Sequence, residues 1–243
     1  MPSPRQTPSQ TVGPFFGVGL TRPSQSQHVL VSERTDGERI RIEGRVLDGV
    51  GSPVEDALVE IWQANAHGRY RHPLDTGPAP LDPAFFGFGR CPTDAHGGFR
   101  FDTVKPGSIR AANGTAQAPH ISVTVFARGM LVHAFTRMYF GDDALDADPA
   151  LALVDSARRR TLVAERTTNG SLVVYRWDIR LQGERETVFF DACRATRTSR
   201  SCSSRIPGLR WRRSTAVRTA RESPRGSAIQ WVIGKARRWS STR

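Results

Sequence analysis

The 243-residue chain has a formal net charge of +12 and a sequence pI near 11.1, but the charge is distributed unevenly. Fourteen of its 35 Lys and Arg residues follow Ala192, with one of its 23 acidic residues, which leaves 21 bases and 22 acids in the first 192 positions. The body is close to neutral, and its composition excludes a basic nucleic-acid-binding face there.

Residues 1–38 are rich in Pro, Ser, Gln and Gly, and they predict an extended N-terminal arm without a core of its own. From Arg39 onward, apolar and polar residues alternate in short runs separated by Gly, Pro and Asp turns. These runs predict strands over 38–48, 57–64, 97–104, 120–129, 130–140, 171–183 and 186–192. Many short strands with turn punctuation predict an all-β fold over residues 39–192, an antiparallel β-sandwich with long loops.

Two segments break the strand pattern. Residues 65–92 form a Pro/Gly-rich loop with several aromatic residues, and long loops on a β scaffold often carry functional sites. Residues 142–166 contain the one short helical segment that we expect, with a basic C-terminal half and apolar Leu151, Val154, Leu162 and Val163. We expect this segment to cover an edge of the sheet or to pack on a neighbouring chain.

The tail over residues 193–243 is rich in Arg, Ser and Thr and has no sustained period. Trp211, Trp231 and Trp239 interleave with arginine, a mixture that can contact nucleic acid by charge and stacking. The abrupt change after residue 192 instead favours a disordered or frameshift-derived tail, because this composition cannot bury enough apolar surface to offset the entropy of ordering.

Cysteine usage and hydropathy restrict the cellular setting. Cys91, Cys193 and Cys202 are too few and too scattered for a disulfide framework or a Cys-rich zinc site, which favours a reduced compartment. The N-terminus has no apolar signal region, and no later run has the length of a membrane span. We therefore expect a cytoplasmic protein.

Candidate metal donors are dispersed along the chain. The motif HGRYRH places His67 and His72 on either side of Tyr70, and His120 opens the strand predicted over residues 120–129. A metal site on that strand needs a second donor close by, and Ser122 stands there. The residue types alone leave open whether this is a metal site, an incomplete one, or neither.

Arg128 interrupts an apolar strand just before Gly129. A buried guanidinium at this position needs an anion, and a planar carboxylate is its bidentate match. A strand-end arginine that pairs with an acid or points to water is an equally good interpretation. The chain has no Gly-x-Ser-x-Gly elbow, phosphate loop or dinucleotide fingerprint, so those chemistries lack support.

Five segments together resemble the intradiol ring-cleavage dioxygenases, and more narrowly the alpha chains of that family's two-chain members. They are TPSQTVGPFFGVGL (7–20), GRVLDGVGSPVEDALVEIWQANAHGRYRHPLD (44–75), FGFGRCPTDAHGGFRFDTVKPG (86–107), APHISVTVFARG (118–129) and YRWDIRLQGERETVFFDA (175–192). The resemblance implies a β-sandwich that assembles as αβ units. It also implies Fe(III) held by two tyrosinates and two histidines, because hard phenolate oxygens stabilise the ferric state.

The resemblance assigns the iron ligands position by position. Tyr70 matches the first tyrosine, Ile109 replaces the second, His120 matches the first histidine, and Ser122 replaces the second. The family's catalytic arginine falls at Gln117. An incomplete set of this kind implies that this chain binds no metal by itself, has no catalytic residue of its own, and depends on Fe(III) bound by a partner beta chain.

The resemblance also implies a substrate-binding role for this chain. Arg128 matches the arginine of an Ala-Arg-Gly motif near the carboxylate of an aromatic substrate. Thr11, Gly13 and Pro14 match a turn that lines the pocket, and Phe15 stands where tyrosine is usual. The loss of that hydroxyl removes one polar contact near the substrate.

Two alternatives remain from the sequence. One is a self-sufficient intradiol dioxygenase with a variant iron site built from Tyr70, His120 and either His67 or His72. The other is a β protein that binds nucleic acid through its basic tail. Iron analysis of the isolated chain and truncation after Ala192 distinguish these alternatives from the subunit hypothesis.

Overall fold

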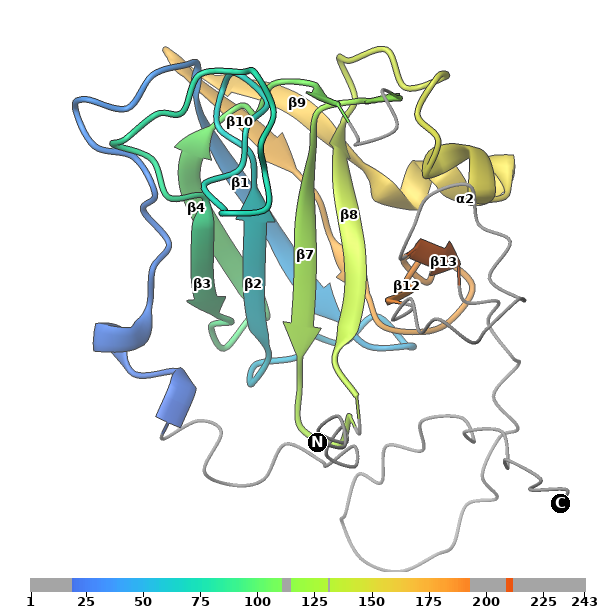
Figure 1. Ribbon diagram of the computed structural model, residues 1–243. Helices are drawn as coiled ribbons and strands as arrows, with labels where there is room; N and C mark the ends of the chain where they lie inside the picture. Colours follow the sequence, from blue (N-terminus) through green and yellow to red (C-terminus); the bar gives the residue numbers. More distant parts are fainter. Residues whose placement is uncertain (1–18, 111–114, 131, 193–208, 212–243) are drawn as a thin grey trace, which may run out of the picture.

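The computed structural model describes residues 19–110, 115–130, 132–192 and 209–211, and within these ranges the chain is mainly β-strand (Figure 1). The strands are β1 (Arg39–Leu47), β2 (Leu58–Gln63), β3 (Phe88–Pro92), β4 (Gly98–Val104), β5 (Ile109–Arg110), β6 (Ala116–Gln117), β7 (His120–Phe126), β8 (Ala134–Phe140), β9 (Val163–Asn169), β10 (Leu172–Arg176), β11 (Ile179–Arg180), β12 (Phe190–Ala192) and β13 (Leu209–Trp211). The helical pieces are the 3-10 turns η1 (Pro23–Gln25), η2 (Leu151–Leu153) and η3 (Arg160–Leu162), and the short helix α2 (Ser156–Arg159). The predicted all-β class with a short helical segment is confirmed. Among the described residues, no helix is both long and apolar enough to span a membrane.

In the described part of the chain, eleven strands form one mixed sheet, with the order β11-β1-β10-β9-β8-β7-β2-β3 along its main path. Strand β4 pairs with β1, and β12 pairs with both β8 and β13. The hairpin pairs are antiparallel as predicted, but β1 pairs with β10 and β11 in parallel, and β8 pairs with β9 in parallel. Parallel neighbours need a long crossover, and residues 141–162 between β8 and β9 provide one.

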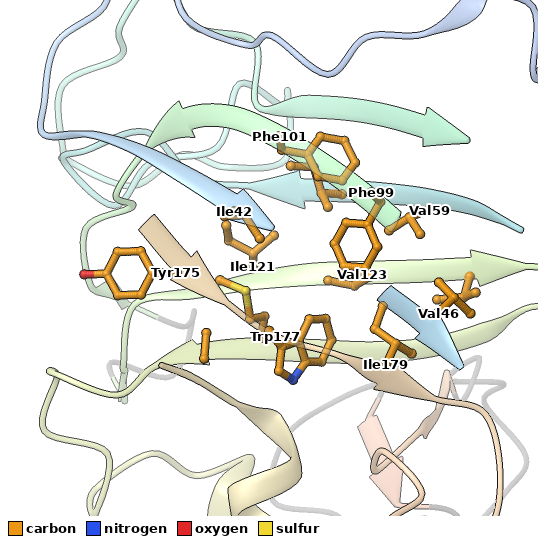
Figure 2. Close-up of a cluster of buried hydrophobic side chains, with 14 of the residues drawn as sticks. Ile42, Val46, Val59, Phe99, Phe101, Ile121, Val123, Tyr175, Trp177 and Ile179 are labelled. Atoms are coloured by element: carbon orange, nitrogen blue, oxygen red, sulfur yellow. The ribbon is translucent and has the colours of Figure 1, made fainter. Parts of the chain in front are cut away.

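The main core lies between the two halves of this sheet. Apolar side chains of β1, β4 and β10, such as Ile42 and Phe101, pack in one cluster with those of β2, β7 and β8, such as Val123. Figure 2 shows these side chains gathered between the strands, with Trp177 and Ile179 among them. Burial of this apolar surface is the main stabilising contribution to the fold.

The predicted alternation of β7 is confirmed. Ile121, Val123 and Val125 belong to the main core, whereas Ser122 and Thr124 face the other way and are half-buried. The second face of β7 and β8 is covered by a smaller apolar cluster, whose buried members are Tyr139, Ala150, Leu151, Val154, Leu162, Val188 and Phe190. The candidate site residues of β7 therefore lie outside the main core.

The predicted helical stretch over 142–166 is much shorter in the structure. Two 3-10 turns and α2 occupy residues 151–162, beside β8 (Figure 1), and β9 begins at Val163. The reason is tertiary, because Leu151, Val154 and Leu162 are buried in the second cluster while Val163 pairs with Tyr139 of β8. Strand β3 was also missed, since it lies inside the segment that we predicted as loop and pairs with β2.

Residues 27–30 of the N-terminal segment run along the sheet. Gln27 exchanges backbone hydrogen bonds with Arg90 of β3, and Leu30 donates its N–H to the carbonyl of Asp102 in β4. Residues 1–18 of the predicted arm lie outside the described residues, as does the predicted tail apart from β13. Strand β13 pairs with β12 in antiparallel register.

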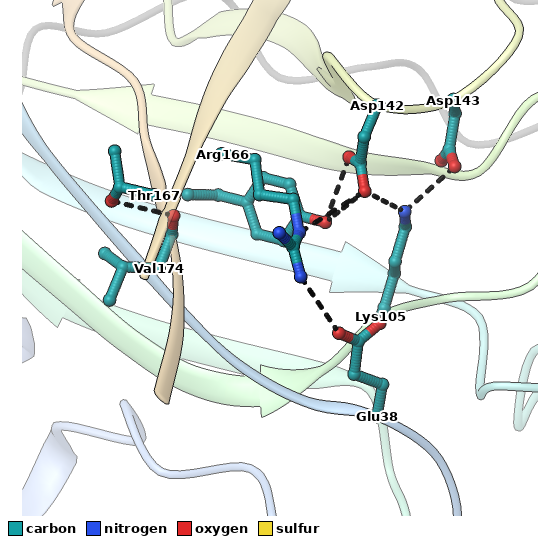
Figure 3. Close-up of polar contacts among 8 residues, drawn as sticks. Glu38, Lys105, Asp142, Asp143, Arg166, Thr167 and Val174 are labelled. Carbon is teal, nitrogen blue, oxygen red and sulfur yellow. Dashed lines mark hydrogen bonds and ion pairs between the residues drawn. The ribbon is translucent and has the colours of Figure 1, made fainter. Parts of the chain in front are cut away.

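A polar cluster joins the ends of several strands (Figure 3). Lys105, which follows β4, donates to Asp142 and Asp143 after β8, at 3.0 and 2.9 Å. Asp142 also accepts from the hydroxyl of Tyr175 in β10 at 3.0 Å and lies 3.6 Å from Nε of Arg166 in β9. The half-buried ammonium of Lys105 and its partners thus connect β4, β8, β9 and β10.

Candidate functional site

The loop that carries Tyr70 is fixed by buried Asn65. The side-chain oxygen of Asn65 accepts from the backbone N–H groups of His67 and Arg69, at 3.0 and 2.9 Å, and its amide nitrogen donates to the carbonyl of Pro80 at 2.9 Å. Gly68 has a φ of +80°, and a Cβ there would lie 2.0 Å from the carbonyl oxygen of Ser108. A glycine is required where this loop meets the residue before Ile109.

Tyr70 lies against the aromatic surface of the loop and beside β7. Its ring stacks on Trp62 with centroids 5.8 Å apart, and its backbone N–H donates to Asp75 Oδ2 at 2.8 Å. Burial raises the pKa of Tyr70, and the positive charge of Arg137 and a hydrogen bond with Ser122 oppose the shift. Tyr70 and Ser122, two positions of the inferred ligand set, are therefore neighbours.

His120 is a fully enclosed imidazole at the start of β7. Its exposed fraction is 1%, Nδ1 lies 2.8 Å from the carbonyl oxygen of Ala118, and its ring contacts Tyr139 at a centroid distance of 5.7 Å. Burial, reinforced by the charge of Arg137, lowers the pKa of His120 to about 3. The ring is therefore neutral at physiological pH.

The positions where the family pattern is interrupted lie in the same region. Ile109 pairs with Gln117 in the small β5–β6 ladder, and both side chains are buried. Gln117 stands three residues before His120, which is the place of the family's catalytic arginine. Ile109 and Gln117 are thus neighbours, and Gln117 is joined through Arg137 to the β7–β8 ladder.

Arg137 is the site residue that the sequence reasoning missed. It lies in β8 directly opposite Ser122, is 7% exposed, and donates from Nη1 to Gln117 Oε1 at 2.9 Å. The available signal was an arginine in the interior of the apolar strand MLVHAFTRMYF. Its orientation depends on the register of β7 with β8, which the sequence does not show.

Asp148 closes the site from the side of the helical segment. Its Oδ1 accepts from the hydroxyl of Tyr139 at 3.2 Å and from the backbone N–H groups of Ala150 and Leu151, at 2.8 and 3.1 Å. Its Oδ2 accepts from the N–H of Ala118 at 2.9 Å, two residues before His120. Burial raises the pKa of Tyr139, so its phenol remains protonated and donates to this carboxylate.

The residues of this pocket do not fit a ferric ion. One phenol and one imidazole remain, Ile109 and Ser122 supply neither donor type, and a guanidinium lies among them. In the described part of the chain, no three His, Cys, Asp or Glu residues group closely enough to hold a metal ion. This set therefore lacks one phenolate and one imidazole of the four donors that the resemblance implies, and the carboxylate of Asp148 is already bonded to Tyr139 and Ala118.

Arg128 lies at the opposite end of β7 from His120. Strand β7 runs from His120 to Phe126, a span of roughly 20 Å, and Arg128 lies in the turn that follows it. Its side chain is 76% exposed and Nε lies 2.8 Å from Asp56 Oδ2. Arg128 is therefore an exposed strand-end cation with an acidic neighbour, and the interpretation as a buried guanidinium is wrong for the isolated chain.

The remaining candidates do not join this pocket. His67 is exposed and lies 3.8 Å from Asp36, and His72 is exposed, with Nδ1 accepting from the N–H of Leu74 at 3.2 Å. Thr11, Gly13, Pro14 and Phe15 lie outside the described residues. A separate open groove of about 1310 Å³ is lined by residues of β1, β4 and α2, and none of the candidate site residues lines it.

Known proteins match this chain over most of its length. The family model described as dioxygenase matches residues 11–183. The alpha chain of protocatechuate 3,4-dioxygenase from Burkholderia cepacia is 48% identical over 204 residues, covering 77% of this chain and 98% of that protein. The corresponding alpha chain from Pseudomonas putida is 42% identical, covering 76% and 96%.

A beta chain and solved structures also match. The beta chain of protocatechuate 3,4-dioxygenase from Burkholderia cepacia is 45% identical over 158 residues, covering 62% of this chain and 67% of that protein. The structure of catechol 1,2-dioxygenase from Pseudomonas arvilla C-1 superposes with a TM-score of 0.51 at 21% identity, covering 72% of this chain and 61% of that one. The latter likeness concerns the fold alone.

Proposed function

The chain belongs to the dioxygenase family whose model matches residues 11–183, and on this premise we propose that it is the alpha subunit of a protocatechuate 3,4-dioxygenase. The enzyme uses O2 to break the ring bond between the two oxygenated carbons of protocatechuate, and both oxygen atoms enter the product, 3-carboxy-cis,cis-muconate. This reaction belongs to aromatic compound catabolism by the beta-ketoadipate pathway. The subunit is active only with an iron-binding beta chain.

The cofactor in this proposal is Fe(3+) held by the partner beta chain, where it supplies the electrophilic centre that binds the two ring oxygens. The chain's own pocket retains Tyr70 and His120 but has Ile109 and Ser122 at the other two ligand positions. Its role is therefore to complete a substrate pocket at the interface between the two chains. Its own contribution is binding and orientation of the substrate.

The observation that carries the proposal is the position of Arg128. It is an exposed guanidinium in the turn after β7, at the far end of a strand that spans roughly 20 Å from His120. Because it is far from the chain's own remnant ligand set, a substrate carboxylate bound by Arg128 would lie in a pocket completed by a second chain. Asp56, 2.8 Å away, orients the guanidinium and leaves further N–H donors for the substrate carboxylate.

The N-terminal arm is the second part of this chain that we propose to line the substrate pocket. Thr11, Gly13, Pro14 and Phe15 would line the substrate pocket from the alpha side. Phe15 stands where the family has tyrosine, so this subunit offers an apolar ring edge in place of a hydroxyl. We expect ring substituents near this edge to be selected by shape more than by hydrogen bonding.

Substitution of Arg128 by Ala in the complex with a beta chain tests the proposal. The KM for protocatechuate should rise about tenfold or more, because a charge-assisted hydrogen bond contributes about 1.5–3 kcal/mol. Catechol lacks the carboxylate, so its KM should not change. Arg45→Ala is the matched control, since Arg45 is also exposed and pairs with a single carboxylate, that of Asp178.

An unchanged KM for protocatechuate, or an equal rise for catechol, would contradict the substrate role of Arg128. Iron in the purified chain alone, at one ion per chain, would instead favour the self-sufficient dioxygenase. At present His67 and His72 give that alternative no support, because both are exposed loop residues. Nucleic-acid binding by the tail is not favoured, because the relatives that match most of this chain are dioxygenase subunits.

A further inference from the structure

Arg137 is a buried arginine beside the remnant ligand set, on the face of the β7–β8 ladder that points away from the main core. It is directly opposite Ser122 in the β7–β8 ladder, and Tyr139 is directly opposite His120. Residues that oppose each other in an antiparallel pair project from the same face, about 4.5–5.5 Å apart at Cβ. The guanidinium therefore extends from the same face as both ligand positions of β7.

The charge of Arg137 is buried without an acidic partner among the described residues. Its side chain donates to the neutral amide of Gln117 at 2.9 Å, and its Nε has no hydrogen-bond partner. A guanidinium does not lose its proton in a protein, so Arg137 carries a permanent positive charge here, while the buried carboxylate of Asp148 is bonded to the hydroxyl of Tyr139 instead. Burial of a charge without an ionic partner costs folding free energy, so we looked for a role of Arg137 that this cost would accompany.

The charge acts on both remaining members of the ligand set. The positive field of Arg137 opposes the burial-induced rise in the pKa of Tyr70, and it adds to the burial-induced fall in the pKa of His120. The strand register gives the same proximity, because Arg137 is opposite Ser122 and lies two residues before Tyr139, whose ring contacts that of His120. A metal ion between those two groups would share its position with a fixed cation.

We propose that Arg137 takes the place of the metal ion in this chain: its side chain fills the pocket between Tyr70, Gln117 and Ser122, and its charge excludes Fe(III) even when the missing ligands are supplied. The loss of iron then has two independent causes, the absent donors and the resident cation. The proposal concerns this chain alone and does not depend on its assembly with a beta chain.

The physical argument is like-charge repulsion at short range in a poorly solvated site. A guanidinium at its buried position cannot be screened by salt as a surface charge is, and the β8 backbone fixes where its side chain starts. A histidine introduced at position 122 would lie directly beside Arg137. Its lone pair would accept a guanidinium hydrogen bond in preference to binding a metal.

The test restores the ligands in the isolated full-length chain. The double variant Ile109→Tyr/Ser122→His supplies the missing phenol and imidazole, and we expect it to remain free of iron and without visible tyrosinate-to-iron absorption after incubation with Fe(III). The triple variant that adds Arg137→Gln should bind Fe(III) at least about tenfold more tightly and gain the visible band. The new glutamine keeps a polar partner for Gln117.

Two controls separate charge from side-chain identity. Arg137→Lys in the ligand-restored chain retains the cation and should bind no more iron than the double variant. Arg45→Gln in the same background removes an exposed arginine of β1 and should also have no effect. Iron content, the visible band and cooperative urea unfolding are measured for every variant.

Stoichiometric iron in the unaltered chain or in the double variant would overturn the proposal, as would a folded triple variant that binds no iron. If the triple variant does not unfold cooperatively, Arg137→Met in the same background is measured instead. Failure of both to fold would show that Arg137 is required by the fold, and this too would overturn metal exclusion as its role.

Discussion

At the scale of single residues, Asp148 links the remnant pocket to the helical segment. It is 2% exposed and accepts four hydrogen bonds, from the hydroxyl of Tyr139 and from the backbone N–H groups of Ala118, Ala150 and Leu151. One carboxylate thereby satisfies donors on both sides of the pocket. Its ionised form is an acceptor only, which suits four convergent donors.

Asp148→Ala is expected to lower the free energy of unfolding by about 3 kcal/mol, because it leaves buried donors without partners. The matched control is Asp155→Ala. Asp155 also accepts a backbone N–H, that of Ala157 at 2.9 Å, but it is exposed and caps only the short α2, so about 1 kcal/mol is expected. Urea denaturation measures both values. Equal losses would show that Asp148 acts only as a local turn cap.

At the scale of elements, the segment from η2 to η3 owes its conformation to packing. Helices shorter than about 12 residues are marginal in water, and α2 has four residues. The segment is held because Leu151, Val154 and Leu162 are buried against Tyr139 and Val188. It serves as the crossover that lets β9 pair with β8 in parallel.

Leu162→Ala should therefore lower the free energy of unfolding by about 2–4 kcal/mol, since a fully buried leucine is removed from a packed cluster. Arg160→Ala, in the same turn but exposed, should change it by less than about 0.5 kcal/mol. Chemical denaturation followed by tryptophan fluorescence checks the pair. Similar small effects for both residues would contradict a segment stabilised by burial.

At the scale of the whole molecule, the Lys105 cluster joins strands that are distant in sequence. Burial tends to lower the pKa of Lys105, but its hydrogen bonds to Asp143 and Asp142 outweigh this and raise the pKa above its ordinary value. Burial tends to raise the pKa of Asp142, but hydrogen bonds from Lys105 and Tyr175 outweigh this and lower it below 3.8. Each charge is thus stabilised in the folded state.

The cluster predicts a specific pH dependence of stability. A carboxyl with a lowered folded-state pKa contributes stability that is present above its unfolded pKa and is lost as the pH falls through the folded value. The raised pKa of Lys105 keeps its own contribution complete at all pH values below about 10. The cluster should therefore stabilise the fold evenly between about pH 5 and 9 and lose this effect below about pH 4.

The difference in unfolding free energy between the unaltered chain and Lys105→Met measures this contribution. It should be constant from pH 5 to 9 and shrink towards acid pH, because protonated Asp142 no longer forms an ion pair with Lys105. Arg45→Met, which breaks an exposed pair, should cost less than about 1 kcal/mol at any pH. A Lys105→Met difference that persists unchanged at pH 2 would contradict the role of the carboxylates.

The sequence by itself determined the elements whose signal is local. The period-2 pattern of β7 placed Ile121, Val123 and Val125 in the core, because alternate side chains of a strand must face opposite sides. The sequence motifs also showed that Tyr70 and His120 are kept in the family's ligand set, whereas Ile109 and Ser122 replace its other two members. The dioxygenase family was identified from the same segments.

Only the tertiary structure decided which strands pair and which side chains lie beside the remnant ligand set. Arg137 reaches Gln117 because β8 pairs with β7 in one register, and a shift by one residue would turn it to the other face. The parallel pairing of β9 and the brevity of α2 likewise depend on burial against residues far along the chain. Local periodicity fixes which face a side chain takes on its own strand, whereas its neighbours are set by long-range register and packing.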